Sequence, residues 1–410
     1  YFRRKVFIPA RFQPVGGCLT RACNPARRSG ESGIMKNEFL RFRSHFIVLA
    51  VAIFVLTGCR TPGDRQFGRQ IDQAVEAEMK RQHVVGAAVG IIRDNRIVHL
   101  KGYGLADRGR KIPVDTDSMF RWASISKPLT ALRALQLWEQ GKLDLDADVR
   151  TYVPEFPDKG VKITLRQLLG HQGGIVHYQN GPVIRAAAEY DVEHPFESVV
   201  LALDTFRESP LVNPPGEKYS YSTHGYILAS AVVERAGKRP FADQVDRGIA
   251  QLLGMKTVQP DYQWLDIPNR ASGYRKVGPL FVPSRNRDVS WKLGGGGYIS
   301  SIDDLARLAR GLLRGKLVSK ETEAMMWTPQ KATSGKATRY GLGFSIDGEG
   351  DNLRVSHGGS QEKVKTWMGF FPNRRTGVVL MCNSEHVNPT EFGERLAKLV
   401  NASDSATSRD

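Results

Sequence analysis

Strand-like segments stand near both ends of the sequence, and this arrangement restricts the possible folds more than any other feature. Residues 84–104 read as two β-strands joined at Asp94-Asn95, a pair that suits a tight hairpin turn. Residues 340–384 contain three or four further strand signals. Two such groups, far apart in a chain of 410 residues, predict a single antiparallel sheet built from both ends of the domain.

Helical periodicity accompanies both groups of strands. Apolar residues recur at helical spacing in 65–82, and they fall on one helical face in 388–400. The middle of the chain, about 151–290, is rich in helical signals, proline and glycine, and we interpret it as a mostly helical inserted region. The predicted fold class is therefore α+β, an antiparallel sheet flanked by helices, in a domain at 66–402 followed by a disordered tail at 403–410.

The first part of the sequence is predicted to lie outside this domain. Residues 1–34 show no periodicity and are interpreted as a non-native upstream segment. From Met35, a basic stretch leads into an apolar run of eleven residues at 46–56, shorter than the roughly 20 residues of a membrane span. This layout predicts a signal peptide at 35–58, with an uncleaved signal anchor as the alternative.

The apolar run ends in Leu56-Thr57-Gly58-Cys59, which resembles a bacterial lipobox. The resemblance implies lipidation of Cys59, a short tether at 59–65, and attachment to the bacterial cell envelope on the periplasmic side. Arg60 follows the cysteine where aspartate is the usual inner-membrane retention signal, which favours the outer membrane.

The charge of the chain is less extreme once this leader is removed. The 58 residues before Cys59 carry ten basic and two acidic side chains, so the formal net charge falls from +17 to +9. The remaining basic residues are scattered and form no run interleaved with aromatic residues. A nucleic-acid partner is therefore not expected, and a basic surface suits an anionic envelope.

Ser124 and Lys127 stand at the start of a predicted helix that runs to Gln140 and is stopped by Gly141. Residues three apart on a helix share a face, so the two side chains can touch. A serine hydroxyl becomes a nucleophile when a neighbouring base takes its proton, and a lysine is such a base if burial lowers its pKa. The alternative is a polar helix start with an exposed lysine.

The same spacing recurs at Ser360 and Lys363, which shows that the pattern alone is weak evidence. This second pair follows a predicted strand, where residues three apart point to opposite faces. We therefore predict that Lys363 is a solvated charge and that Ser124 is the reactive serine.

Two further motifs accompany the first pair: PPGEKYSYST at 214–223 and VSHGGSQ at 355–361. Together with phrases such as ITLRQLLGHQGGI and GGGGYISSIDDLARLA, their order and spacing resemble the penicillin-recognising serine hydrolases. That family includes class C β-lactamases, DD-peptidases and related esterases. The resemblance covers about residues 66–402. It implies a β-lactamase/transpeptidase-like fold and a serine hydrolase that cleaves amide or ester bonds through an acyl-enzyme.

The resemblance implies roles for three catalytic residues. Ser124 matches the acylated nucleophile, and Lys127 matches the lysine of the same motif. Tyr221 matches the tyrosine that helps to move the proton in class C relatives. The backbone N–H groups of Ser124 and Ser360 are implied to form the oxyanion hole, where two fixed donors contribute several kcal/mol to transition-state stabilisation.

The implied substrate-binding residues are Thr223 and the strand motif His357-Gly358-Gly359 with Ser360. Thr223 stands where the family has asparagine, and a hydroxyl lacks the amide that grips an acylamino carbonyl. His357 stands where β-lactamases commonly have lysine; it is a weaker carboxylate anchor, and its charge is expected to vary near neutral pH. Both departures favour an esterase, a peptidase or a poor β-lactamase.

No metal or organic cofactor is expected. His171 and His177 are predicted to be structural, since no metal-ligand spacing accompanies them, and the four glycines at 294–297 are predicted to form a tight loop. The expected partners are a small-molecule or peptide acyl substrate and, through the lipid anchor, a membrane. A β-lactam, a D-Ala peptide and a small ester all remain open as substrates. The alternative, motivated by Thr223, is a degenerate envelope-anchored protein that binds peptidoglycan without turnover.

Overall fold

The computed structural model describes residues 62–407 of the chain, with side chains for residues 63–402. The predicted upstream segment, the signal peptide and the lipidation site at Cys59 lie outside the described residues. Among the described residues, no helix is both long enough and apolar enough to cross a membrane.

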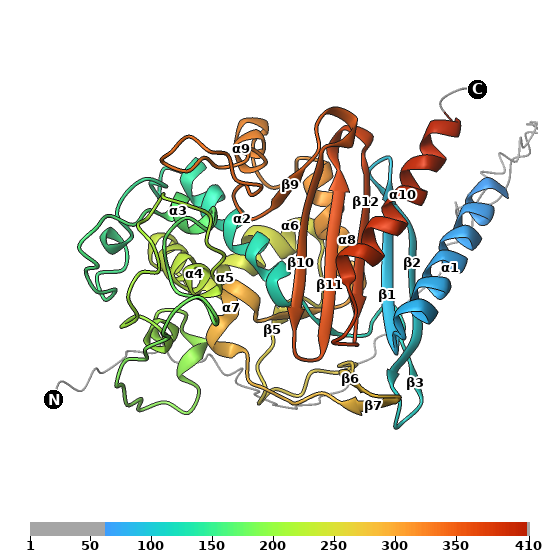
Figure 1. Cartoon of the computed structure of the whole chain (residues 1–410), viewed down its shortest axis with the longest axis horizontal. Coiled ribbons are helices and arrows are strands. Elements are labelled where there is room, and N and C mark those ends of the chain that lie inside the picture. The colour runs from blue at the N-terminus through green and yellow to red at the C-terminus, as the bar shows by residue number, and fades with distance from the viewer. Residues whose placement is uncertain (1–61, 408–410) are drawn as a thin grey trace, which may run out of the picture. The chain divides into compact units, whose positions relative to one another are not determined.

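A seven-stranded antiparallel sheet forms one half of the domain (Figure 1). It joins the two strand groups predicted from the sequence, because β1 of the first group pairs with β12 of the second, with Ala87 opposite Cys382. Across the sheet the strands are β3 (Ile112–Pro113), β2 (Arg96–Asp107), β1 (Gly86–Arg93), β12 (Thr376–Cys382), β11 (Val364–Phe371), β10 (Arg354–Gln361) and β9 (Ser345–Asp347).

The hairpin predicted at Asp94-Asn95 is confirmed. Both residues have positive φ, at 48° and 59°, and together they connect β1 to β2. The two-residue turn whose twist matches that of paired strands requires two successive residues in the left-handed conformation. Asparagine and aspartate tolerate this conformation better than most residues.

Each face of the sheet is covered by helices. Helices α1 (Pro62–Gln82) and α10 (Pro389–Thr407) pack on one face, where Val89 and Ile91 of β1 meet their apolar side chains. Helix α8 (Ile302–Leu313) packs on the other face. A Cβ atom added at Gly90 would lie 3.2 Å from Cβ of Ala306, so this glycine lets α8 approach β1 closely.

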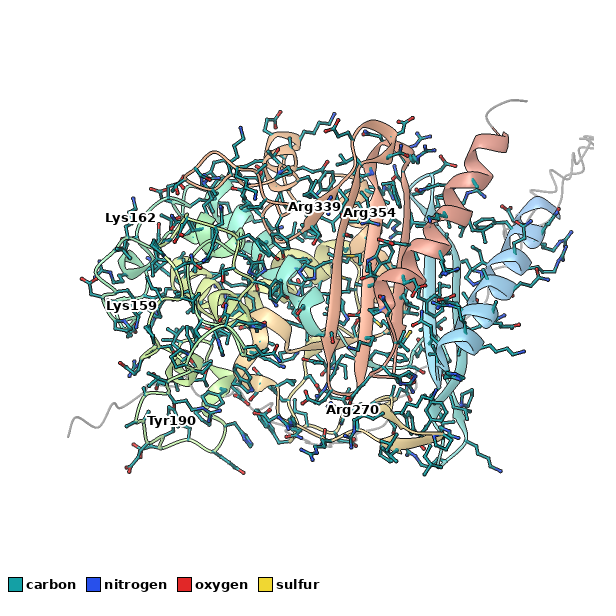
Figure 2. The ribbon with its side chains drawn as sticks, viewed as in Figure 1. Lys159, Lys162, Tyr190, Arg270, Arg339 and Arg354 are labelled. Carbon is teal, nitrogen blue, oxygen red and sulfur yellow. The ribbon has the colours of Figure 1, made fainter. Side chains whose placement is uncertain are left out.

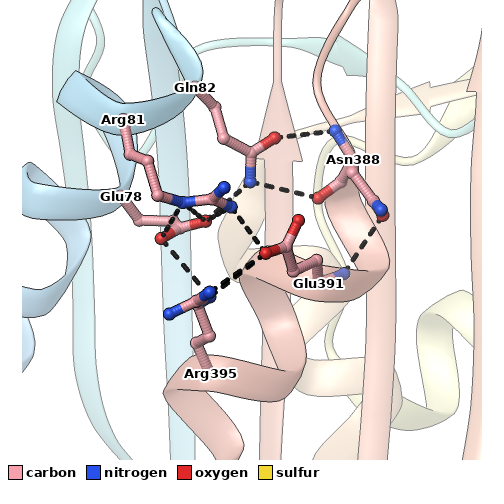
Figure 3. Close-up of polar contacts among 6 residues, drawn as sticks. All are labelled: Glu78, Arg81, Gln82, Asn388, Glu391 and Arg395. Carbon is pink, nitrogen blue, oxygen red and sulfur yellow. Dashed lines mark hydrogen bonds and ion pairs between the residues drawn. The ribbon is translucent and has the colours of Figure 1, made fainter.

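The two helices predicted at the ends of the domain also bind each other through polar side chains (Figure 3). Arg81 of α1 forms ion pairs with Glu78 and, at 2.9 Å, with Glu391 of α10. Gln82 accepts a hydrogen bond from the backbone N–H of Asn388 at 2.8 Å. These contacts join the beginning and the end of the folded chain on the same face of the sheet.

A mostly helical region forms the other half of the domain (Figure 1). Figure 2 shows Lys159 on this side, where its Nζ donates to the carbonyl oxygens of Arg207 and Ser209 at 2.7 and 2.9 Å. Besides α8, the helices here are α2 (Ser126–Glu139), α3 (Leu165–Leu169), α4 (Thr223–Gly237), α5 (Phe241–Val245), α6 (Gln251–Leu253), α7 (Leu293–Gly296) and α9 (Lys320–Met326).

Three predicted boundaries differ from the structure. The tether predicted at 59–65 is wrong for 62–65, because α1 begins at Pro62. The helical region begins at α2 and ends at α9, so it is wider than 151–290, and it shares one compact unit with the sheet. It also contains short strands at Gln259–Pro260, Tyr274–Val277 and Leu280–Pro283. The disordered tail predicted from 403 is wrong for 403–407, because α10 continues to Thr407.

Candidate active site

Ser124 lies in a short 3-10 turn, Ala123–Ile125, that leads directly into α2. Ser124 was predicted to stand at the start of the helix, whereas α2 begins at Ser126. Ala123 has a φ of 49°, a left-handed conformation that is uncommon for a residue with a Cβ atom. The turn buries Ala123 and Ile125 but leaves Ser124 partly exposed at the edge of a cavity.

Lys127 occupies the first turn of α2, and its side chain is fully buried. Its Nζ lies 3.2 Å from Oγ of Ser124, so the predicted contact between the two side chains is present in the structure. It also lies 3.2 Å from Oγ1 of Thr223 and donates to the carbonyl oxygen of Gly295 at 2.7 Å. Among the described residues, no carboxylate lies within ion-pair distance of this nitrogen.

The surroundings of Lys127 favour the neutral amine. Burial lowers its pKa well below the usual value, and the positive charge of Lys292 lowers it further. A neutral amine has one lone pair, and the Gly295 carbonyl and the Thr223 hydroxyl can take its two N–H groups. The lone pair is then available to accept the proton of the Ser124 hydroxyl, which is the task of a general base.

Tyr221 lies just before α4, and its ring centroid is 4.8 Å from Nζ of Lys127. Burial raises the pKa of Tyr221 above its usual value, and a side-chain hydrogen bond with Ser124 opposes this shift. The phenol is therefore protonated at neutral pH. A protonated phenol next to both Ser124 and Lys127 can pass a proton between them and a leaving group.

Thr223 is the first residue of α4 and is also buried. The preceding residue, Ser222, caps the helix, because its Oγ accepts a hydrogen bond from the N–H of Gly225 at 2.9 Å. This cap fixes the start of α4 against Lys127. The backbone N–H of Thr223 donates to Nδ1 of His177 at 3.2 Å, which ties a second loop to the site.

His357 lies on β10, and both of its ring nitrogens have partners within the protein. Nδ1 lies 2.7 Å from the carbonyl oxygen of Gly358, and Nε2 lies 2.9 Å from the hydroxyl of Tyr340. Burial lowers the pKa of His357 to about 3. The expectation that its charge varies near neutral pH is therefore wrong, because burial disfavours the charged form of the ring.

Gly359 allows β10 to lie directly against the turn that carries Ser124. A Cβ atom at this position would lie 2.0 Å from Oγ1 of Thr366 and 2.5 Å from the carbonyl oxygen of Trp122. Oγ1 of Thr366 already donates to that carbonyl at 2.9 Å. The strand motif and the reactive serine are thus held together by a contact that only glycine permits.

The second serine–lysine pair does not form a site. Lys363 lies in the turn between β10 and β11 with a φ of 73°, and its Nζ bonds to Oδ1 of Asn286. Burial lowers the pKa of Lys363 to about 8, so most of the amine is still charged at pH 7, but the side chain is half-buried and less solvated than predicted. Oγ of Ser360 accepts instead from Nζ of Lys365, its cross-strand neighbour, at 2.5 Å.

The four glycines at 294–297 form helix α7 and its end, not the predicted loop. A Cβ atom at Gly294 would lie 2.4 Å from that of Ser230 in α4, and one at Gly295 would lie 2.7 Å from Cγ2 of Thr223. The absence of side chains therefore lets α7 pack between α2 and α4. This packing is what brings the Gly295 carbonyl to Lys127.

A cavity of about 510 Å³ opens at Ser124. Several of the residues that line it were not expected from the sequence, because only tertiary packing brings them there. His177 was taken as structural but faces the cavity, whereas His171 is buried among tyrosine rings. The lining side chains not anticipated from the sequence are those of His177, Tyr178, Lys292, Tyr340, Ser345, Gln361, Pro389 and Thr390.

A serine beside a buried lysine, on a turn held against an antiparallel sheet, is the arrangement expected of a serine hydrolase that uses a lysine as its general base. In agreement with this class, the family model "Beta-lactamase" matches residues 71–402. The chain therefore belongs to the beta-lactamase family, and its predicted fold class and its assignment to the serine hydrolases are confirmed.

Three comparisons illustrate the family. The mitochondrial serine beta-lactamase-like protein LACTB of Mus musculus is 29% identical, over 70% of this chain and 68% of that protein. Penicillin-binding protein 4* of Bacillus subtilis is 25% identical, over 82% and 75%. The structure of EstCE1, described as a hydrolase with promiscuous acyltransferase activity, superposes with a TM-score of 0.70 at 21% identity, covering 82% of this chain and 99% of that one.

Proposed function

We propose that this protein hydrolyses small esters or amides through a covalent acyl-enzyme on Ser124. The observation that carries the proposal is the buried Lys127 amine, which lies 3.2 Å from Oγ of Ser124 and has no carboxylate partner among the described residues. Burying a lysine without a carboxylate partner destabilises a fold. A role as the base for a neighbouring nucleophile would explain why a lysine is buried here.

In the proposed mechanism, Lys127 accepts the proton of Ser124 as Oγ forms a bond to the substrate carbonyl carbon. The backbone N–H groups of Ser124 and Ser360 donate to the oxyanion. As the oxyanion collapses, the bond to the leaving group breaks, and the proton passes from Lys127 through Tyr221 to that group. Water then attacks the acyl carbon, its proton returns by the same route, and the Ser124 hydroxyl is restored.

The proposed substrate range follows from Thr223 and His357, the two binding residues that differ from those common in β-lactamases. The Thr223 hydroxyl is occupied by Lys127, so it is poorly placed to grip an acylamino carbonyl. His357 is neutral and buried, so it supplies no charge for a penicillin carboxylate. We therefore infer that esters or peptides are better substrates than penicillins.

Mass spectrometry of the intact protein after rapid acid quenching tests this proposal with p-nitrophenyl butyrate, benzylpenicillin and a D-Ala-D-Ala peptide. We expect a transient acyl adduct on Ser124 with the ester or the peptide, accompanied by product, and a slower or absent reaction with penicillin. A long-lived adduct without product would instead support the degenerate binding protein. No adduct and no product with any of the three would contradict the acyl-enzyme.

We also propose that Cys59 carries a lipid and anchors the domain to the bacterial envelope, with the outer membrane favoured. The support is the lipobox-like sequence before Cys59 and the basic charge of the remaining chain. In bacteria that express the whole chain and are fed radiolabelled palmitate, the protein should become labelled and should fractionate with membranes. The Cys59→Ser variant should show neither property. Equal labelling of both proteins would contradict the anchor.

A further inference from the structure

Lys292 is a second buried lysine in the cavity at Ser124. It ends the short 3-10 helix Ser290–Lys292, directly before α7, and is 9% exposed. Its Nζ lies 5.9 Å from the ring centroid of Tyr178 and 5.6 Å from that of Trp291. The amine thus lies beside two aromatic rings, and Lys292 lines the same cavity as Ser124.

Among the described residues, no hydrogen bond or ion pair engages this amine, although two carboxylates lie near enough to affect it. Glu362 is instead paired with Arg287, at 3.3 Å. Asp288 accepts hydrogen bonds from the N–H and the hydroxyl of Ser290, at 3.1 and 2.6 Å. Lys292 therefore presents to the cavity a positive group that has no direct partner among the described residues, and leaving a buried charge unpaired is costly.

The cavity itself favours an anion. Its lining side chains include Lys292 but, within the described part of the chain, no aspartate or glutamate. A substrate ammonium would therefore find no partner there, whereas a carboxylate could form a charge-assisted hydrogen bond with Lys292. Burial lowers the pKa of Lys292 to about 8, so most of the amine is still protonated at pH 7.

We propose that Lys292 binds a carboxylate of the substrate, so that the hydrolase prefers acyl compounds that carry a negative charge. This inference rests on the proposed function and narrows its substrate class. The buried neutral His357 cannot serve as the anchor. Lys292 reaches the cavity from the segment before α7, whereas His357 lies on β10 of the sheet.

Two pairs of matched esters test the proposal. The first pair is p-nitrophenyl hexanoate and the p-nitrophenyl monoester of adipate, which differ by a carboxylate on the acyl group. The second pair is phenyl hexanoate and 3-(hexanoyloxy)benzoate, which differ by a carboxylate on the leaving group. In the wild type, we expect kcat/KM to be about 10- to 100-fold higher for the charged ester of at least one pair.

Lys292→Met should abolish this preference, and Lys292→Arg should keep part of it. Lys316→Met is the matched control, because Lys316 is exposed after α8 and its loss changes the net charge equally. The preference is a ratio within each variant, so an indirect effect of Lys292 on the pKa of Lys127 cancels. No preference in the wild type, or an unchanged preference in Lys292→Met, would overturn the proposal.

Failure of the proposed hydrolase activity is distinguishable from failure of this inference. If the wild type hydrolyses no ester, binding of monomethyl adipate and methyl hexanoate is measured by isothermal titration calorimetry. Tighter binding of the charged compound to the wild type but not to Lys292→Met would retain the carboxylate site without the activity. Equal affinities, or binding of neither compound, would overturn the site.

Discussion

Ser124→Ala is expected to lower kcat/KM for p-nitrophenyl butyrate by about four orders of magnitude. The variant retains the cavity, Lys127 and the backbone donors, but it has no oxygen to form the acyl bond. Residual hydrolysis would then come only from water activated in a site that still binds the ester. Release of p-nitrophenolate by the purified domain, compared at the same protein concentration, measures the effect.

Ser360→Ala is the matched control for this experiment. Ser360 belongs to the second serine–lysine pair, and its hydroxyl accepts a hydrogen bond from Lys365. Alanine keeps the backbone N–H, which is the group assigned to the oxyanion, so activity should fall by less than about tenfold. Equal activity in Ser124→Ala and the wild type would show that another residue is the nucleophile.

Lys127→Met is expected to remove most of the hydrolase activity. It is also expected to reduce the pH dependence of the free energy of unfolding at pH values below the pKa of a free lysine. Methionine fills a similar volume but cannot accept the Ser124 proton, so acylation should slow by about 10²- to 10⁴-fold. The same substitution removes an amine whose burial disfavours its charged form.

The sign of the stability effect follows from proton binding. The folded-state pKa of Lys127 is lowered, so between that pKa and about 10.5 the unfolded chain binds one more proton than the folded protein. In this window the free energy of unfolding rises with pH by up to about 1.4 kcal/mol per pH unit in the wild type, and Lys127→Met lacks this contribution.

Urea denaturation of both proteins at pH 7 and pH 9 measures this difference. The variant should gain stability relative to the wild type as the pH is lowered. Lys292 and Lys363, whose pKa values are also lowered, are present in both proteins, so their contributions largely cancel. Parallel pH profiles would show that Lys127 stays charged in the folded protein and would contradict its role as a neutral base.

The sequence predicted those parts of the fold that depend on neighbouring residues. The turn at Asp94-Asn95 requires residues that tolerate positive φ, and α1 and α10 each need an apolar stripe; both signals are local. The pair Ser124 and Lys127 was also predictable, because its spacing on a helix brings the side chains together.

The parts that sequence analysis missed depend on packing between distant segments. Lys127 needs the carbonyl of Gly295, 168 positions away, to engage its amine. The neutrality of His357 depends on its burial, which a residue type does not reveal. Lys292 reaches the cavity because α7 packs between two other helices, a consequence of glycines that had been interpreted as a loop.

The pairing of β1 with β12 has a consequence for how the protein is made. The centre of the sheet joins residues separated by almost 300 positions, so it cannot form until nearly the whole domain has been synthesised. Until then β1 presents an open edge with apolar side chains on both faces, a state that is prone to aggregation. A chain delivered across a membrane before folding would complete this sheet only after export, when both ends of the domain share one compartment.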